Sequence, residues 1–477
     1  MKIKNWYLWV VVFSVIYVLP LIIANVSYVD DMGRAIDGYG WIGDGRLLAD
    51  YVVKGVTFGN GIVTVFPFSL ILSAVIYAMS GVVISSVLFE IDSKLKRLSA
   101  FVFISSPFLL ENMAYKFDAL PMSLSVFFAV LPFIIKDTIR FFVTSVICLV
   151  MTFHLYQTSA MLYFGMVLCL MIKQCSKNEK SIDLRLVIIT LSSFFIAYAV
   201  YSGTLHFMDV TVGRNNILPL EKASLNVIHG RIGYYVSVYD RLFDGGYRIA
   251  GLPILIIAVF SFALMGFNGV KKINLMMIMV YLFGVFLLVM LPNLILVTGW
   301  VTARTFICFP LLIYAIIIVA NASSSKVHEN IYVVCLLFLF GFSFFVSSIF
   351  GSTLKANDDY SKYIAQNVTN DIFDVSSENS YSFNVVISGE RPDAINNIVT
   401  FNSFPFLRML SPTYMVEGWS WGVRDLSRYA RMNFLGDNAK YVKDRCSWPV
   451  LKQRGIYHLL KKDNVYIVDF NYKACKQ

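Results

Sequence analysis

Long apolar runs recur along most of this chain, and no other feature of the sequence constrains its fold as strongly. The runs lie at residues 6–26, 62–89, 99–110, 119–135, 141–155, 158–172, 186–205, 249–268, 274–296, 305–321 and 331–350. Most can cross the roughly 30 Å hydrocarbon core of a bilayer as a helix, although the third, fifth and sixth are short for a complete span. Apolar residues make up 57% of the sequence and charged residues only 15%, far outside the soluble globular range. We therefore predict an all-α polytopic membrane protein with about eleven transmembrane helices.

The net charge of +10 reflects membrane topology rather than nucleic-acid binding. The basic residues occupy short connectors between alternate apolar runs, as expected for cytoplasmic loops. They are Lys2, Lys4, Lys94, Lys96, Arg97, Lys136, Arg140, Lys173, Lys177, Lys180, Arg185, Lys271, Lys272 and Lys326. We therefore expect a multi-pass protein of the bacterial inner membrane, surrounded by lipid, with a cytoplasmic N-terminus and an uncleaved first run. Residues 27–60, 111–118, 206–248, 297–304 and everything after 351 then face the periplasm.

Two regions follow from the distribution of apolar residues. Residues 1–350 form the predicted membrane domain, with a first periplasmic loop at 27–60, and residues 351–477 form a polar periplasmic domain. In the second region, YSFNVVISG (381–389) and NVYIVDF (464–470) alternate with a period of two and indicate strands. VRDLSRYARMNFLG (423–436) indicates a helix that ends at a glycine. A small α/β domain is the expected result.

The cysteines and histidines indicate no metal site, because none of them has the spacing of a zinc-ligand cluster. Cys446 and Cys475 both lie in the predicted periplasmic domain. In that oxidising compartment they can form a disulfide, and the alternative is two free thiols.

The first periplasmic loop begins with adjacent carboxylates, Asp30 and Asp31, close to the point where the first helix leaves the membrane. Charges are costly at that depth unless they have a function. One carboxylate could act as a general base, and burial of both would raise the pKa of one of them. The alternatives are a solvated pair that caps a turn, or a metal site. Arg34 and Arg46 follow, as ligands for a lipid phosphate or as partners of lipid headgroups or nearby aspartates.

After several glycines, the same loop changes to helical spacing. Leu47, Leu48, Tyr51, Val52 and Val56 form one face, and Asp50 and Lys54 lie on the other. This pattern predicts a short amphipathic helix that can lie along the membrane surface.

Three further groups of polar residues lie at predicted periplasmic helix ends. Glu111, Lys116 and Asp118 fall within SPFLLENMAYKFDALPMSLS (106–125), which is either the rim of a cavity or a solvated hairpin. His154, Tyr156 and Gln157, in FHLYQTS, either contact a sugar or phosphate or serve the structure alone. Arg304, in TGWVTARTF, either binds phosphate or extends toward the headgroups.

Two of these motifs resemble the serotype-converting O-antigen glucosyltransferases of phage and bacterial origin, the Gtr type II glucosyltransferase family. The first motif matches through Asp30, Asp31, Arg34, Trp41, Gly45, Arg46, Leu48, Ala49 and Asp50, and the second through Glu111, Asn112, Tyr115, Asp118, Leu120 and Pro121. HLYQTS follows. The resemblance is specific over about residues 28–160, and beyond that it covers only topology and tail placement.

This resemblance implies a GT-C type membrane fold and transfer of glucose from undecaprenyl-phosphate glucose to a sugar of the lipid-linked O-antigen. We expect catalysis by Asp30 or Asp31. We expect substrate binding by Arg34, Trp41, Arg46, Asp50, Glu111, Tyr115, Lys116, Asp118, His154, Tyr156, Gln157 and Arg304. No cofactor is expected, and separate partner proteins would make the donor and flip it across the membrane. Two alternatives stay open: a GT-C transferase for another sugar or acceptor, and a flippase or transporter of lipid-linked sugars. A transporter would typically place charges at the bilayer midplane and show internal repeats, which this sequence lacks.

Overall fold

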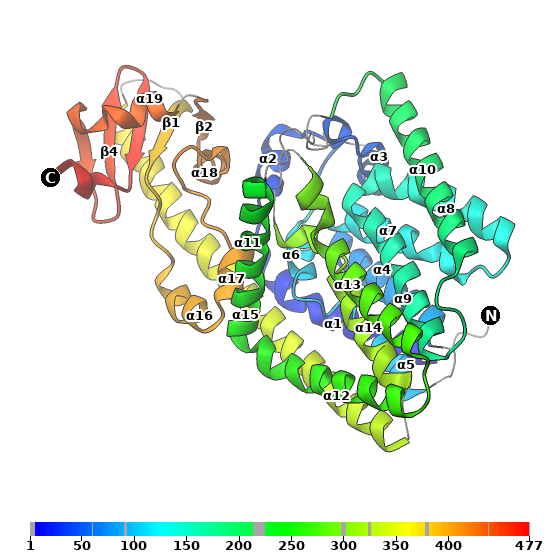
Figure 1. Cartoon of the computed structure of the whole chain (residues 1–477). Helices are drawn as coiled ribbons and strands as arrows, with labels where there is room; N and C mark the ends of the chain where they lie inside the picture. The colour runs from blue at the N-terminus through cyan, green and yellow to red at the C-terminus, as the bar shows by residue number, and fades with distance from the viewer. Residues whose placement is uncertain are drawn as a thin grey trace. The chain divides into compact units, whose positions relative to one another are not determined.

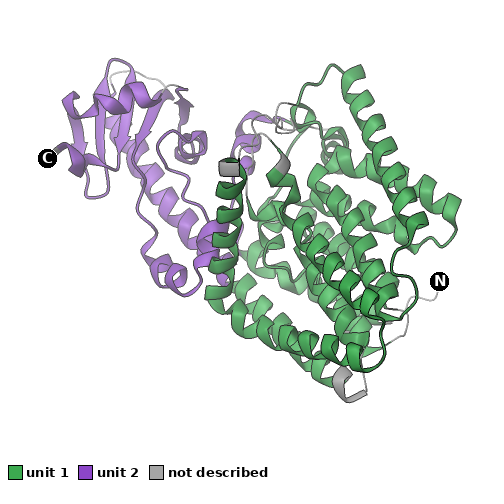
Figure 2. Cartoon of the chain, viewed as in Figure 1, with its two compact units in different colours: residues 1–23, 40–348 green, residues 24–39, 349–477 purple. Residues whose placement is uncertain are grey.

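A computed structural model describes residues 5–59, 61–89, 93–212, 225–296, 302–322, 326–376, 381–436 and 438–476 (Figure 1). The chain divides into two compact units (Figure 2): residues 1–23 with 40–348, and residues 24–39 with 349–477. We call them unit 1 and unit 2. Several residues used to predict topology lie outside the described ranges, namely Lys2, Lys4 and parts of the predicted periplasmic segments 206–248 and 297–304.

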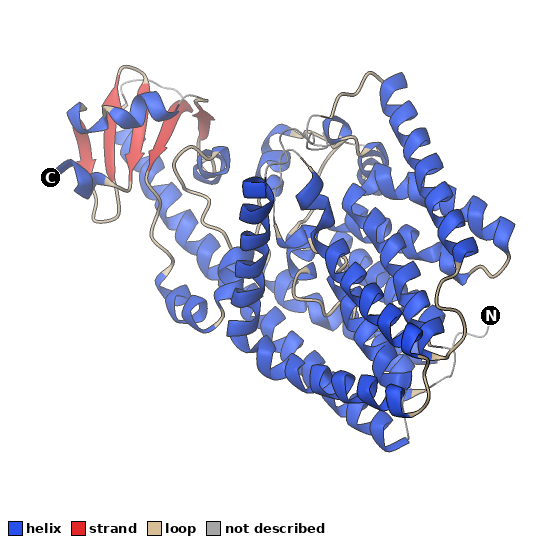
Figure 3. Cartoon of the chain, in the orientation of Figure 1, coloured by secondary structure: helices blue, strands red, loops and turns tan. Residues whose placement is uncertain are grey.

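Unit 1 consists of helices (Figure 3). In chain order they are α1 (Asn5–Ala24), η1 (Ile42–Asp44), α3 (Leu47–Val56), α4 (Phe68–Leu88), α5 (Lys94–Ser99), α6 (Leu109–Ala114), α7 (Ala119–Val130), η2 (Leu131–Ile134), α8 (Thr138–Leu155), η3 (Gln157–Ala160), α9 (Met161–Ser176), α10 (Leu184–Phe207), α11 (Leu225–Leu242), η6 (Phe243–Tyr247), α12 (Arg248–Phe267), α13 (Lys272–Ile295), η7 (Ala303–Thr305) and α14 (Phe309–Ala322). The 50-residue helix α15 (Lys326–Val375) begins in unit 1 and continues into unit 2.

Eight helical segments in the described part of the chain are long and apolar enough to cross a membrane. Two shorter apolar helices, Ala119–Ile134 and Phe309–Ala322, accompany them. The predicted helical class is therefore confirmed, and these segments have the length and composition of membrane spans. The sequence predicted about eleven spans, which is more than these eight long segments. The run 99–110 explains part of the difference, because residues 100–105 and 107–108 form turns between α5 and α6. Pro107 disfavours helical geometry at Ser106, the residue before it.

The first loop supplies a helix where helical spacing was predicted, and the structure shows which of its side chains pack against the rest of the protein. In α3, Leu47, Ala49 and Val53 are buried, and so is Asp50, whereas Tyr51 is 65% exposed. Ala49 and Val53 join Trp41, Phe117 and Leu155 in one apolar cluster. Packing against α7 and α8 thus selects the face that turns inward.

Unit 2 contains a five-stranded sheet of order β2-β1-β5-β4-β3. The strands are β1 (Ser382–Ser388), β2 (Arg431–Phe434), β3 (Val450–Gln453), β4 (His458–Lys462) and β5 (Val465–Asp469). β1 pairs in parallel with both β2 and β5, and the other pairings are antiparallel. The helices are α2 (Asp30–Asp37), η8 (Ile395–Asn397), α16 (Ile398–Ser403), α17 (Pro405–Leu410), α18 (Ser420–Leu426), α19 (Asn438–Lys443), η9 (Arg445–Ser447) and η10 (Tyr472–Lys476).

The sheet has a core on each face, because successive side chains of a strand point to opposite faces and both faces are covered. In β1, Val385 and Ile387 pack with Val368 and Ile372 of α15, while Val386 packs on the opposite face with Trp448. The strands predicted within 381–389 and 464–470 are confirmed as β1 and β5.

The helix predicted over residues 423–436 is wrong. α18 ends at Leu426, and β2 begins at Arg431. The hydroxyl of Ser427 accepts a hydrogen bond from the Met432 backbone N–H at 3.2 Å, which turns the chain. Residues 431–434 then gain parallel backbone pairing with β1. Long-range strand pairing therefore overrides a local helical pattern.

Cys446 and Cys475 form a disulfide that closes a segment of 29 residues between η9 and η10. Of the two alternatives that the sequence left open, the structure contains the bonded pair.

Candidate active site

The acid pair begins α2, directly after a strained residue. Val29 has φ 43° and ψ −103°, in a region that β-branched residues rarely adopt. Its N–H donates to the Tyr414 hydroxyl at 3.2 Å, and Tyr28 donates from its hydroxyl to the Leu410 carbonyl at 2.8 Å. Because such strain persists only where the surroundings enforce it and often marks functional sites, it makes the start of α2 a candidate site.

The two carboxylates of the pair have different environments. Asp31 is completely buried, and its Oδ2 accepts the Tyr28 backbone N–H at 3.0 Å. Asp30 is partly exposed. Both lie in the first turn of α2, where the helix dipole favours negative charge. Asp31 therefore has a structural role at the helix start, and Asp30 is more accessible to a substrate.

Arg34 lies on the same helix and is 2% exposed. Its Nη1 donates to the Tyr39 carbonyl at 3.1 Å, and its guanidinium carbon lies 4.9 Å from the centre of the Tyr39 ring. These contacts anchor the segment that follows α2. They make Arg34 a support for α2 as well as a candidate phosphate ligand.

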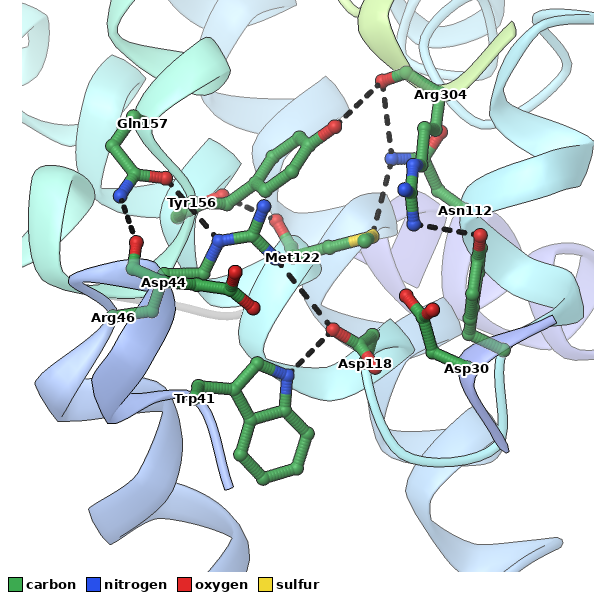
Figure 4. Close-up of polar contacts among 12 residues, drawn as sticks. Asp30, Trp41, Asp44, Arg46, Asn112, Asp118, Met122, Tyr156, Gln157 and Arg304 are labelled. Carbon is green, nitrogen blue, oxygen red and sulfur yellow. Dashed lines mark hydrogen bonds and ion pairs between the residues drawn. The ribbon is translucent and has the colours of Figure 1, made fainter. Parts of the chain in front are cut away.

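In unit 1, Asp118 joins the first loop to the second predicted motif (Figure 4). Its Oδ1 accepts a hydrogen bond from Trp41 Nε1 at 2.6 Å and lies 3.7 Å from Arg46 Nη1. Asp118 is 1% exposed and Trp41 is 0% exposed. The interpretation of this segment as a solvated hairpin is therefore wrong for Asp118, and equally for Glu111, which is 4% exposed.

Arg46 is held on three sides. Besides Asp118, its Nε donates to Gln157 Oε1 at 3.2 Å, and its guanidinium lies 4.7 Å from the centre of the Tyr156 ring. Gln157 in turn donates from Nε2 to the Asp44 carbonyl at 2.9 Å and to the Tyr201 hydroxyl at 3.1 Å. A planar guanidinium fixed in this way is pre-organised to donate two hydrogen bonds to an anion such as a phosphate.

Arg304 is held by residues of the second motif. Its backbone N–H donates to Glu111 Oε2 at 2.8 Å, and its Nη1 donates to the Tyr115 hydroxyl at 2.6 Å. Its backbone carbonyl accepts from the Tyr156 hydroxyl at 3.3 Å and from Asn112 Nδ2 at 3.5 Å. Burial raises the pKa of Tyr156, against the opposing charges of Arg304 and Arg46, so its hydroxyl stays protonated and able to donate.

The family model described as glucosyl transferase GtrII matches residues 19–344. That range includes the acid pair of α2 and every residue of the Asp118, Arg46 and Arg304 network. The chain belongs to the glucosyl transferase GtrII family.

A related protein of Salmonella phage P22, described as an uncharacterized 55.3 kDa protein in the gtrB 5' region, is 27% identical over 237 residues. The match covers 49% of this chain and 46% of that protein, so the chain spans about half the length of this curated relative. No solved structure matches the chain.

Three of the residues expected to bind substrate in this GtrII chain have other contacts. Asp50 pairs with Lys54 at 2.6 Å. The Lys116 ammonium lies 5.1 Å from the centre of the Phe66 ring. His154 packs edge-on against Tyr201, with ring centres 4.9 Å apart. These contacts neither assign nor exclude substrate binding, which stays a prediction for all three.

Two further residues shape the group of side chains around Arg46: Tyr201, which sequence reasoning missed, and Gly45, which belongs to the first motif. Tyr201 contacts both Gln157 and His154, but it lies within the long apolar run 186–205, where nothing distinguishes it. Gly45 adopts φ 71°, and a Cβ there would lie 2.6 Å from the Tyr201 hydroxyl.

In the described part of this GtrII chain, no three His, Cys, Asp or Glu side chains lie close enough to hold a metal ion. What the residues do provide is an acid pair on α2 and two oriented arginines in unit 1. A carboxylate can take a proton from a hydroxyl, and arginines can stabilise a phosphate that leaves with negative charge.

Proposed function

We propose that this protein transfers glucose from undecaprenyl-phosphate glucose to a sugar of the lipid-linked O-antigen, on the periplasmic face of the bacterial inner membrane. The observation that carries the proposal is the GtrII family match over residues 19–344, which contains both groups of candidate residues. The eight long apolar helical segments fit a substrate that is attached to lipid.

In the proposed reaction, a hydroxyl oxygen of the acceptor sugar attacks the anomeric carbon of glucose. A new C–O glycosidic bond forms as the bond between that carbon and the phosphate oxygen breaks. The proton of the acceptor hydroxyl passes to a carboxylate. The electron pair of the broken bond between the anomeric carbon and the phosphate oxygen leaves with the polyprenyl phosphate. We assign the base to Asp30, because Asp31 is buried and holds the Tyr28 N–H.

We assign stabilisation of the departing phosphate to Arg46 and Arg304. The Arg46 guanidinium is held by Gln157 and by the buried Asp118, and the Arg304 guanidinium is held by the buried Tyr115. Little reorganisation is therefore needed when negative charge develops. Arg34 and Lys116 are further candidate cations. Trp41, Glu111, Tyr115, Asp118, Tyr156 and Gln157 would act by orienting these groups, and Asp50 and His154 stay candidates for contact with sugar.

The disulfide between Cys446 and Cys475 supports a periplasmic location for unit 2, because disulfides form and persist in oxidising compartments. A lipid-linked donor used on that face must be made and moved across the membrane, which requires a donor synthase and a flippase as functional partners.

Mass spectrometry of O-antigen tests the proposal. Polysaccharide from cells that express the protein, together with its donor synthase and flippase, should gain one hexose per repeat, and glycosidic analysis should identify it as glucose. Cells without the protein provide the control. A hexose other than glucose would point to a different transferase of the same type. Unmodified O-antigen in expressing cells would reject transfer and favour transport of lipid-linked sugars.

A further inference from the structure

Unit 2 contains a cleft that none of the roles assigned above uses. It has a volume of about 490 Å³, and its walls come from the C-terminal end of α2, from α18 and from the edge strand β2. The lining residues that matter here are Asp37, Arg424, Tyr429, Arg431, Asn433 and Phe434. The cleft therefore combines planar polar groups with aromatic rings.

This combination suits a saccharide. A sugar ring has an apolar face of C–H groups and an edge of hydroxyls that both donate and accept hydrogen bonds. Tyr429 and Phe434, which are 50% and 37% exposed, offer ring surfaces for the apolar face. Carboxylate, amide and guanidinium groups can pair with neighbouring hydroxyls.

Three polar side chains of the cleft, Asp37, Arg424 and Asn433, are held in place by other protein groups. Arg424 Nη1 pairs with Asp37 Oδ2 at 2.8 Å, and the Arg424 guanidinium lies 5.1 Å from the centre of the Trp421 ring. Asn433 donates from Nδ2 to Ser382 Oγ at 3.0 Å and to Asn384 Oδ1 at 3.3 Å. Fixed side chains reduce the entropy lost on binding.

Helix α2 connects this cleft to the acid pair. Asp30 and Asp31 are its first two residues, and Asp37, its last residue, lines the cleft. An eight-residue helix is about 12 Å long, at 1.5 Å per residue. A saccharide chain in the cleft would thus lie within a few sugar units of the acid pair, along one rigid element.

We propose that this cleft binds the saccharide part of the acceptor, at sugars beyond the one that is glucosylated. The proposal rests on the proposed function for the identity of the saccharide. Such a subsite would select among O-antigen repeats by their sequence of sugars, and it would hold the acceptor while the reacting hydroxyl is placed.

The test uses the full-length protein in lipid nanodiscs and two variants, Tyr429→Ala and Asn433→Ala. The probe is O-polysaccharide released by mild acid from a host strain that lacks this gene. Binding is measured without donor, by saturation-transfer NMR and titration. Each variant should bind roughly three- to tenfold more weakly, as expected for the loss of one stacking or hydrogen-bonding contact. In transfer assays, KM for the acceptor should rise by a similar factor, with kcat and the donor KM unchanged.

Two matched controls lie on unit 2 outside the cleft. Tyr363→Ala removes a ring that is 55% exposed on α15, and Asn402→Ala removes an exposed amide on α16. Both should bind the polysaccharide like the wild type. The proposal is overturned if the wild type does not bind it, or if the cleft variants bind as tightly as the controls. Polysaccharide binding without hexose transfer would reject the proposed function and keep the cleft as a saccharide site. Hexose transfer together with cleft variants that bind the polysaccharide like the wild type would keep the proposed function and reject the cleft as a saccharide site.

Discussion

The indole nitrogen of Trp41 donates a 2.6 Å hydrogen bond to Oδ1 of Asp118, from 77 residues away in the chain. The same oxygen lies 3.7 Å from Arg46 Nη1. Trp41 therefore fixes the position of the buried Asp118 carboxylate. Through Asp118, Trp41 is connected to Arg46, the arginine that we assign to the phosphate.

Replacing Trp41 with Phe should weaken both stability and activity. Phenylalanine retains most of the packing in the cluster with Ala49, Val53 and Phe117 but removes the N–H donor. The charged acceptor Asp118 then loses a buried partner, which costs about 1–3 kcal/mol. Thermal unfolding of the detergent-purified protein and hexose incorporation measure the two effects. Trp9→Phe is the control, because Trp9 is 61% exposed. Equal stability of both variants would show that the hydrogen bond contributes nothing.

Arg46→Lys keeps the positive charge but loses the planar fork. Lysine cannot donate to Gln157 and form an ion pair with Asp118 while stacking on Tyr156, as Arg46 does. We expect hexose transfer to fall at least about tenfold, the effect of losing roughly 1.4 kcal/mol of transition-state stabilisation. Protein abundance should be normal. Arg140→Lys, at an exposed position on α8, is the control. Full activity of the lysine variant would exclude bidentate phosphate binding by Arg46.

The sequence predicted the helical membrane-spanning class, the strands β1 and β5, and a helix at α3, because apolar period and length determine these features locally. It could not predict which face of α3 is buried. Asp50 turns inward and Tyr51 outward because α3 packs on α7 and α8. The strand β2 was missed for a similar reason, since its pairing with β1 joins segments about 50 residues apart.

Within the candidate site, the sequence predicted which residues take part, but it could not predict which side chains contact one another. Trp41, Arg46, Asp118, Gln157 and Arg304 were all selected from motifs, but no local pattern shows that Trp41 and Asp118 are bonded. The positive φ of Val29 was likewise invisible, because valine normally indicates extended or helical backbone.

Asp30→Asn and Asp31→Asn should have different effects. If Asp30 is the base, its asparagine variant should lose roughly 100- to 10,000-fold in transfer rate with unchanged stability. Asp31→Asn weakens the acceptor for the Tyr28 N–H and removes a charge from the first turn of α2. It should cost about 0.5–1 kcal/mol of stability and retain most activity. Single-turnover transfer assays and thermal unfolding separate the two effects. An inactive Asp31 variant beside an active Asp30 variant would reverse the assignment.

Gly45→Ala should destabilise the loop that carries Arg46. Gly45 has φ 71°, and an added Cβ would lie 2.6 Å from the Tyr201 hydroxyl and 2.9 Å from Val212 Cγ2. Backbone strain and the contacts together should cost about 1–3 kcal/mol. Gly43→Ala provides a closely matched control two residues away, because no atom lies within 4 Å of its added Cβ. Thermal unfolding measures both. A Gly45 variant as stable as the Gly43 variant would show that the loop adapts without cost.

Thiol labelling of intact spheroplasts can determine which side of the membrane each region faces. Asn402→Cys places an exposed thiol on α16 of unit 2, and Glu179→Cys places one in the basic connector after α9. A Cys335→Ser background is suitable, because the other four free cysteines are buried. Basic connectors remain in the cytoplasm, so a membrane-impermeant reagent should label position 402 directly and position 179 only after permeabilisation. The reverse pattern would place unit 2, with its acid pair, in the cytoplasm. A nucleotide-activated sugar would then replace the lipid-linked sugar as the expected donor.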